Sequence, residues 1–249
     1  MRATRCGRRG AKPRRREAHV STEESLGPVI VTGAASGLGE AVGRALAALG
    51  HPVLGLDRRP ARGLDAIEVD LADGAAAEQA LREGVEKLGG LWGLVTAAGT
   101  DACGALDEVP RDDWERVVRV NLLGTAAVIR AALPHLERTR GRIVTVASTL
   151  GLRAVDHATA YCASKFGVVG FTRALARELA GRVGVTLLVP GGMQTHFFDG
   201  RDPRYQPGPD ADLADPADVA QLVVASLRGP ASCQVREIVV CPATEPSWP

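Results

Sequence analysis

Hydrophobic residues along this chain fall in short runs that alternate with longer amphipathic stretches. Short apolar runs bounded by Gly, Pro or Asp are typical of buried parallel strands, and apolar positions repeating every three to four residues are typical of helices. The pattern predicts strands at residues 28–32, 52–56, 66–69, 91–97, 142–147, 185–189 and 237–241, and helices at residues 38–49, 74–88, 111–137, 158–180 and 216–227.

Strict alternation of strands and helices predicts an α/β fold. Strands joined by helices pair in parallel, and the helices cover both faces of the sheet. We therefore expect a single-domain, doubly wound (Rossmann) parallel sheet of about seven strands over residues 26–249. The chain has 249 residues, of which 45% are hydrophobic, a size and composition that suit one such domain. Residues 196–215 form the longest irregular stretch, and we expect a lid or a disordered segment there.

The net charge of +1 is distributed unevenly. Residues 1–20 contain eight Lys or Arg and one acid, whereas the rest of the chain contains 22 basic and 28 acidic residues. We interpret residues 1–25 as a basic, disordered extension, because the composition cannot build a packed core. A poor transit peptide, residues upstream of the true start and a nucleic-acid-binding arm are alternatives. The acidic body predicts no nucleic-acid partner, and strand-length apolar runs predict no membrane span.

The five cysteines show neither CxxC pairing nor the spacing of metal ligands. They are Cys6, Cys103, Cys162, Cys233 and Cys241. This pattern favours a reduced, cytoplasmic compartment and predicts no metal site.

The first predicted strand runs into the sequence TGAASGLG at residues 32–39, and a helix follows. Glycines allow a tight turn and close approach of the backbone to a pyrophosphate, while the N-terminus of the helix offers free N–H groups. The position between a strand and a helix predicts a dinucleotide-binding loop. Its expected cofactor-binding residues are Thr32, Gly33, Ser36, Gly37, Leu38 and Gly39.

Acidic residues end the second and third predicted strands. Asp57 lies 18 residues past the last glycine of the loop, where a carboxylate can bind both ribose hydroxyls of NAD and repel the 2′-phosphate of NADP. A turn-capping role is the alternative. Arg58 or Arg59 could instead bind a 2′-phosphate, so we predict NAD and leave NADP open. Asp70 and Leu71 are expected on the adenine side of the cofactor, with a helix N-cap as the alternative for Asp70.

Tyr161 is followed four residues later by Lys165, in a chain with only two tyrosines and three lysines. Residues i and i+4 share one face of a helix, so both groups can point into one site. A nearby ammonium would lower the pKa of the phenol, which could then act as a general acid or base. The alternative is a packed tyrosine beside a solvated lysine.

With the glycine loop, Tyr161 and Lys165, the chain resembles the short-chain dehydrogenase/reductase family over about residues 28–241. Residues 96–99 (TAAG) resemble the family's NNAG stretch, with Thr and Ala replacing the two Asn. Asn121 matches its catalytic asparagine, and Ser148, 13 residues before Tyr161, matches its serine. Residues 190–195 (PGGMQT) match its PGxVxT stretch.

The resemblance implies an NAD(P)-dependent oxidoreductase that transfers a hydride between nicotinamide and a ketone or secondary alcohol. Tyr161 would be the general acid/base, and Lys165 would lower its pKa and bind the nicotinamide ribose. Ser148 would hold the substrate oxygen, and Asn121 would support Lys165 through a water. Further cofactor contacts are implied at Ala98, Gly99, Pro190, Gly191, Met193 and Thr195.

The resemblance also implies a homodimer or homotetramer. Residues 236–242 lack the glycine pair that many relatives carry after the last strand, which weakens the expectation of the usual tetramer contact.

The substrate wall is expected from residues 149–157 and 196–215, with Thr149, Arg153, Phe197 and Phe198 as candidates. The adjacent phenylalanines could close an apolar lid over a hydrophobic substrate, or one could simply anchor the loop. Alternative functions are a catalytically silent cofactor-binding regulatory protein, a nucleotide-sugar epimerase or dehydratase, and a DNA-binding protein that uses the basic tail.

Overall fold

A computed structural model describes residues 27–230 and 232–248, and the expected extension at residues 1–25 lies outside them. Seven strands form one parallel sheet in the order β3-β2-β1-β4-β5-β6-β7. The strands are β1 (Val29–Thr32), β2 (Val53–Asp57), β3 (Asp65–Glu68), β4 (Gly93–Thr96), β5 (Arg142–Val146), β6 (Gly184–Pro190) and β7 (Glu237–Val240). The sheet confirms the predicted Rossmann-type fold, and the strand boundaries differ from the expected ones by one or two residues.

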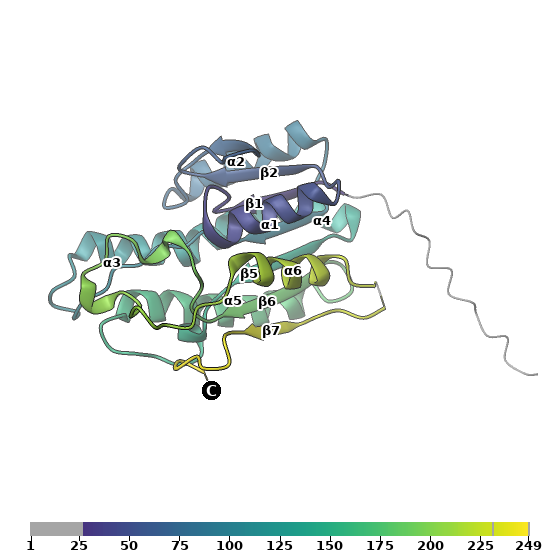
Figure 1. The fold of residues 1–249 in the computed structure, drawn as a ribbon. Coiled ribbons are helices and arrows are strands. Elements are labelled where there is room, and N and C mark those ends of the chain that lie inside the picture. The colour runs from purple at the N-terminus through teal and green to yellow at the C-terminus, as the bar shows by residue number, and fades with distance from the viewer. Residues whose placement is uncertain (1–26, 231, 249) are drawn as a thin grey trace, which may run out of the picture.

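Helices cover both faces of the sheet (Figure 1). The helices α1 (Gly37–Ala48) and α6 (Pro216–Leu227) pack together on one face. The opposite face carries α2 (Gly74–Leu88), α4 (Thr125–Thr139) and α5 (Thr159–Glu178). Because both faces are buried, the central strands β1 and β4 are apolar at almost every position rather than alternating.

The long helix predicted at residues 111–137 is interrupted by a π-helical segment. It consists of α3 (Arg111–Val118), the π-helical η1 (Arg119–Gly124) and α4. An 18-residue window of this stretch has a mean hydropathy of 1.4, enough for a membrane span by length and composition, but 50% of the window is buried inside the protein. Its apolar character is therefore that of a core helix.

Residues 196–215 fold into two short 3-10 turns, η3 (His196–Phe198) and η4 (Pro203–Tyr205). Figure 1 shows this segment, between β6 and α6, on the same side of the molecule as α3 and the C-terminal end. Met193 and Ala214 form a bridge that closes the base of the loop. Residues 196–202 of this segment line the cleft that is described below, and a role as a lid stays a prediction.

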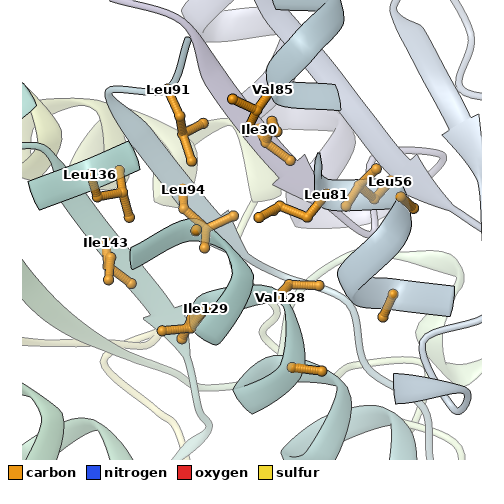
Figure 2. Close-up of a cluster of buried hydrophobic side chains, with 14 of the residues drawn as sticks. Ile30, Leu56, Leu81, Val85, Leu91, Leu94, Val128, Ile129, Leu136 and Ile143 are labelled. Carbon is orange, nitrogen blue, oxygen red and sulfur yellow. The ribbon is translucent and has the colours of Figure 1, made fainter. Parts of the chain in front are cut away.

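Buried aliphatic side chains form the core between the sheet and the helices α2 and α4 (Figure 2). Leu94 of β4 lies at its centre, with Ile30 of β1 and Ile143 of β5 on either side in the sheet register. All three side chains are 0% exposed. This layer fixes the central strands whose carboxyl ends form the site.

Replacing Leu94 by alanine should destabilise the protein by about 2–5 kcal/mol, because the substitution leaves a cavity in a core that cannot fully collapse. Urea denaturation of the parent and the variant measures the difference. Leu106→Ala is the matched control, since Leu106 is 66% exposed and its loss should cost less than about 0.5 kcal/mol. Equal losses for the two variants would contradict the described packing.

Candidate active site

A cleft of about 1500 Å³ opens at the carboxyl ends of the strands. Its walls include residues from the segments that follow all seven strands. The strand order reverses between β1 and β4, and open α/β sheets bind ligands at such a switch point. The volume exceeds the roughly 300–1,000 Å³ of common small-ligand pockets, so a dinucleotide and a second small molecule can share the cleft.

The glycine loop after β1 forms a cradle that only glycine permits. Gly33 and Gly37 have φ angles of 73° and 57°, in the left-handed region. A Cβ atom on Gly33 would lie 2.8 Å from the backbone nitrogen of Ala98, and one on Gly39 would lie 2.2 Å from the carbonyl oxygen of Gly33. The Ala98 N–H donates to Thr32 Oγ1 at 3.1 Å, which joins the β1 and β4 loops.

The cradle fits the pyrophosphate of a dinucleotide, because α1 begins at Gly37 and presents its free N–H groups to the cleft. Gly33, Ser36, Gly37 and Leu38 line the cleft as predicted. The other two predicted residues of the loop, Thr32 and Gly39, do not line the cleft. They stabilise the conformation of the loop through the contacts described above.

Asp57 at the end of β2 is fixed by two backbone donors. Its Oδ2 accepts from the Ala35 N–H at 3.1 Å, and its Oδ1 accepts from the Arg59 N–H at 3.0 Å. The Arg59 guanidinium reaches across the cleft mouth and donates to Ser36 Oγ at 3.0 Å. Arg58 also lines the cleft. A carboxylate and guanidinium groups therefore lie together where the cofactor ribose is expected.

Asp70 lines the cleft beside Leu71 and also caps the turn that follows β3. Its Oδ1 accepts from the Ala72 N–H at 3.0 Å, and its Oδ2 pairs with Arg116 of α3 at 2.9 Å. The backbone hydrogen bond from Ala72 and the Arg116 guanidinium hold the pKa of this carboxyl below its usual value. The predicted cofactor position and the alternative of a cap therefore coincide in one residue.

The structure brings Ser148, Tyr161 and Lys165 together at the inner end of the cleft. Ser148 follows β5, and the other two project from the first turns of α5. The ammonium of Lys165 lies 5.6 Å from the centre of the Tyr161 ring and donates to the Val146 carbonyl at 2.9 Å. The Ser148 side chain lies close enough to the Tyr161 hydroxyl to lower the pKa of that phenol. The phenol, the hydroxyl and the cation can thus act on one small group.

Asn121 lies behind this trio, in the π-helical segment, and is 1% exposed. Its Oδ1 accepts from the Thr100 N–H at 2.8 Å, and its Nδ2 donates to the Thr100 carbonyl and to Ser164 Oγ, both at 2.9 Å. A Cβ atom on Gly99 would lie 3.6 Å from Asn121 Oδ1 and 3.7 Å from Lys165 Nζ. Asn121 thus joins the β4 loop to α5, and Gly99 leaves the space beside Lys165 clear.

Burial shifts the pKa values of the two α5 groups in opposite directions. Burial raises the pKa of Tyr161 above its ordinary 10.0, although the Ser148 side chain and the Arg201 charge oppose the shift. Burial lowers the pKa of Lys165 to about 8. This differs from the expectation that the Lys165 ammonium lowers the phenol pKa, because desolvation of the phenolate is the largest influence on that pKa. Tyr161 is a proton-bearing phenol at neutral pH.

The remaining predicted cofactor residues lie along the cleft wall. They are Ala98 and Gly99 after β4, and Pro190, Gly191, Met193 and Thr195 at and after the end of β6. They line the same cleft as the glycine loop, and their contacts with a cofactor stay a prediction.

Three of the four predicted substrate residues line the inner end of the cleft, namely Thr149, Phe197 and Phe198. The Phe197 ring lies 5.6 Å from the Tyr161 ring, so this segment reaches Tyr161. Arg153 is exposed and lies outside the residues that line the cleft. The 3-10 turn at Thr149–Gly151 carries the chain outward before position 153, which places this arginine on the surface.

Two features of this end of the cleft could not be found from the sequence. Asp101 and Arg201 form an ion pair with 3.0 Å between the charged atoms. The segment after β7 returns to the site, where Glu245 Oε2 accepts from the Gly192 N–H at 2.8 Å and Ser247 Oγ donates to Thr149 Oγ1 at 2.7 Å. Both features join segments that are remote in sequence, and no local sequence motif predicts them.

The strand order and the glycine cradle are typical of dinucleotide-binding proteins. The chain matches the family model described as short chain dehydrogenase over residues 28–206. It is 35% identical to meso-2,3-butanediol dehydrogenase of Serratia marcescens over 184 residues, covering 69% of this chain and 73% of that protein. It is 30% identical to 3-ketodihydrosphingosine reductase of Bacteroides thetaiotaomicron over 192 residues, covering 75% and 71%.

Among solved structures, a short chain dehydrogenase from Burkholderia cenocepacia in complex with NADP superposes with a TM-score of 0.76 at 30% identity, covering 87% of this chain and 96% of that one. The chain therefore belongs to the short-chain dehydrogenase/reductase family of NAD(P)-dependent oxidoreductases.

The lowered pKa of Lys165 predicts how the stability of the protein depends on pH. The unfolded chain holds the Lys165 proton up to about its ordinary pKa of 10.5, whereas the folded protein releases it near 8. Between these values the unfolded state binds more protons, so stability should rise with pH. Below pH 8 both states are protonated, and the full cost of the buried cation remains.

The free energy of unfolding should therefore increase from pH 7.5 to 9.5 in the parent relative to Lys165→Met, which has no proton to lose at this position. Urea denaturation across that range measures the difference. A constant or falling difference would show that the folded protein does not release the Lys165 proton in this window.

Proposed function

We propose that this protein interconverts a small-molecule ketone and the corresponding secondary alcohol, with Tyr161 as the proton donor and acceptor. The observation that supports the proposal most directly is the convergence of Ser148, Tyr161 and Lys165 in one part of a cleft that also contains the dinucleotide cradle. Hydride transfer leaves charge on the substrate oxygen, and such a trio can bind and protonate that oxygen.

The cofactor, when bound, supplies or accepts the hydride, and the protein fixes the geometry. In carbonyl reduction the Ser148 hydroxyl donates a hydrogen bond to the substrate oxygen, and Tyr161 transfers its proton to that oxygen. Alcohol oxidation reverses these steps. Lys165, held by the Val146 carbonyl, supports the phenolate and binds the nicotinamide ribose. Asn121 is a positioning residue that keeps the Thr100 backbone against α5.

A cofactor-binding regulatory protein without turnover is the second candidate. No contact in the site favours this second function. Ser148, Tyr161 and Lys165 all line the cleft, and Asn121 is hydrogen-bonded behind them. A screen of ketones and secondary alcohols with NADH, NADPH, NAD and NADP, followed by nicotinamide absorbance, discriminates the two functions.

Tyr161→Phe should lower turnover by roughly 10²-fold or more, because the ring remains and the transferable proton is lost. Cofactor affinity should be retained. Tyr205→Phe is the matched control, since the Tyr205 hydroxyl contacts His157 at 3.3 Å on the exposed side of the loop. The measurements are steady-state kinetics and cofactor titration. Near-parental turnover of Tyr161→Phe would disprove the acid/base role.

We also propose that NAD is preferred over NADP. The Asp57 carboxylate is held by two backbone N–H groups at the strand end, so it cannot turn away from a 2′-phosphate without losing them. The charge repulsion would then disfavour NADP. Arg59, which contacts Ser36 across the cleft mouth, and Arg58 act in the opposite direction because either can pair with a phosphate.

Asp57→Ala should weaken NAD binding and strengthen NADP binding, because it removes the ribose acceptor and the repulsive charge together. Each charge-assisted hydrogen bond contributes roughly 1.5–3 kcal/mol, so the preference should change by at least tenfold. Fluorescence titration of parent and variant with both cofactors measures it. Tighter binding of NADP than of NAD by the parent would reject the proposal and direct attention to Arg58 and Arg59.

A homodimer or homotetramer in the cytoplasm is the assembly we propose. Large apolar side chains are exposed on two faces, with Leu123 at 56% and Phe166 at 45% on the η1–α5 face, and Leu222 and Val239 each at 39% on α6 and β7. Contact with a second copy of the chain would remove these apolar side chains from water, which favours association.

A further inference from the structure

The ion pair between Asp101 and Arg201 is shielded from solvent. Their side chains are 8% and 15% exposed, and the charged atoms are 3.0 Å apart. Asp101 follows β4, and it also accepts from the Ala102 N–H at 2.7 Å and from Cys103 Sγ at 3.2 Å. Arg201 belongs to the segment after β6. The pair therefore joins the lid to the central part of the sheet.

Arg201 also contacts both phenylalanines of the lid. Its guanidinium carbon lies 4.7 Å from the ring centres of both Phe197 and Phe198. The two rings meet edge to face at 5.7 Å, and Phe197 lies 5.6 Å from the Tyr161 ring. Contacts therefore run without a break from Asp101 to the proposed acid/base group.

The charges around the inner end of the cleft disfavour an anion. Asp101 neutralises Arg201, so that guanidinium is not available to a ligand. Glu245 adds a carboxylate to the cleft lining, held by the N–H of Gly192 next to the base of the lid. Asp202 is paired outward with Arg204, whose side chain is 67% exposed. A substrate carboxylate would meet the Glu245 carboxylate here, and the Arg201 guanidinium, which is already paired with Asp101, would not be free to compensate it.

We propose that Asp101 and Arg201 form a specificity-determining latch. The pair holds Phe197 and Phe198 over Tyr161, and because it consumes the Arg201 charge, the pocket takes an uncharged hydrophobic ketone or secondary alcohol and rejects one that carries a carboxylate. This inference rests on the proposed oxidoreductase function, but the latch itself is a property of the protein without substrate.

The specificity is tested with matched substrates, a keto ester and the free keto acid of the same carbon skeleton. The parent should show a kcat/KM for the ester about 10²-fold above that for the acid, since like charges in an enclosed site cost several kcal/mol. Asp101→Asn keeps the shape and frees Arg201, so the ester-to-acid ratio should fall at least tenfold. A parent that prefers the acid, or an unchanged ratio in the variant, would overturn the proposal.

The latch is tested without turnover, by amide hydrogen exchange of residues 196–205 in the parent, Asp101→Asn and Arg201→Gln. Both variants should exchange about tenfold faster or more in this segment, because local opening no longer breaks the ion pair. Arg204→Gln removes a nearby exposed arginine and should behave like the parent. Parental protection in both latch variants would refute the latch. A parent that turns over neither ester nor acid would count against the proposed function, while the exchange result would still decide the latch.

Discussion

The site depends on the divergence of β1 and β4, two neighbours in the middle of the sheet whose chains leave their carboxyl ends toward opposite faces. At this divergence two backbones approach so closely that a Cβ atom on Gly33 would lie 2.8 Å from the Ala98 nitrogen. The Thr32 hydroxyl accepts from that same N–H. The close approach fixes the distance between the glycine cradle and the β4 loop, on which Asn121 and the lid contacts depend.

The fold and the cofactor cradle could be predicted because their determinants are local. Apolar runs of strand length and amphipathic segments of helix length are visible in short windows, and the requirement for glycine at Gly33 and Gly37 is set by the turn itself. The π-helical segment Arg119–Gly124 could not be predicted, because one extra residue in a turn barely changes the periodicity of a long amphipathic helix. Yet that segment carries Asn121.

The contacts that hold the substrate end together could not be predicted, because they join distant segments. Arg153 and Arg201 are both loop arginines in the sequence, but one is exposed and the other pairs with Asp101, which lies 100 residues earlier. The anchoring of the C-terminal segment by Glu245 depends in the same way on where β7 ends. The direction of the Tyr161 pKa shift was likewise set by burial, which spacing alone does not report.

One physical cause, removal of water, links the lid to the chemistry. Burial disfavours both charged forms, so it raises the pKa of Tyr161 and lowers that of Lys165. Phe197 lies against the Tyr161 ring and is held there by Arg201, so the latch maintains part of that burial. An opened lid would hydrate the phenol and return its pKa toward the ordinary 10.0. Substrate selection and the proton affinity of Tyr161, the acid/base group that we propose, would thus be two consequences of the same closed segment.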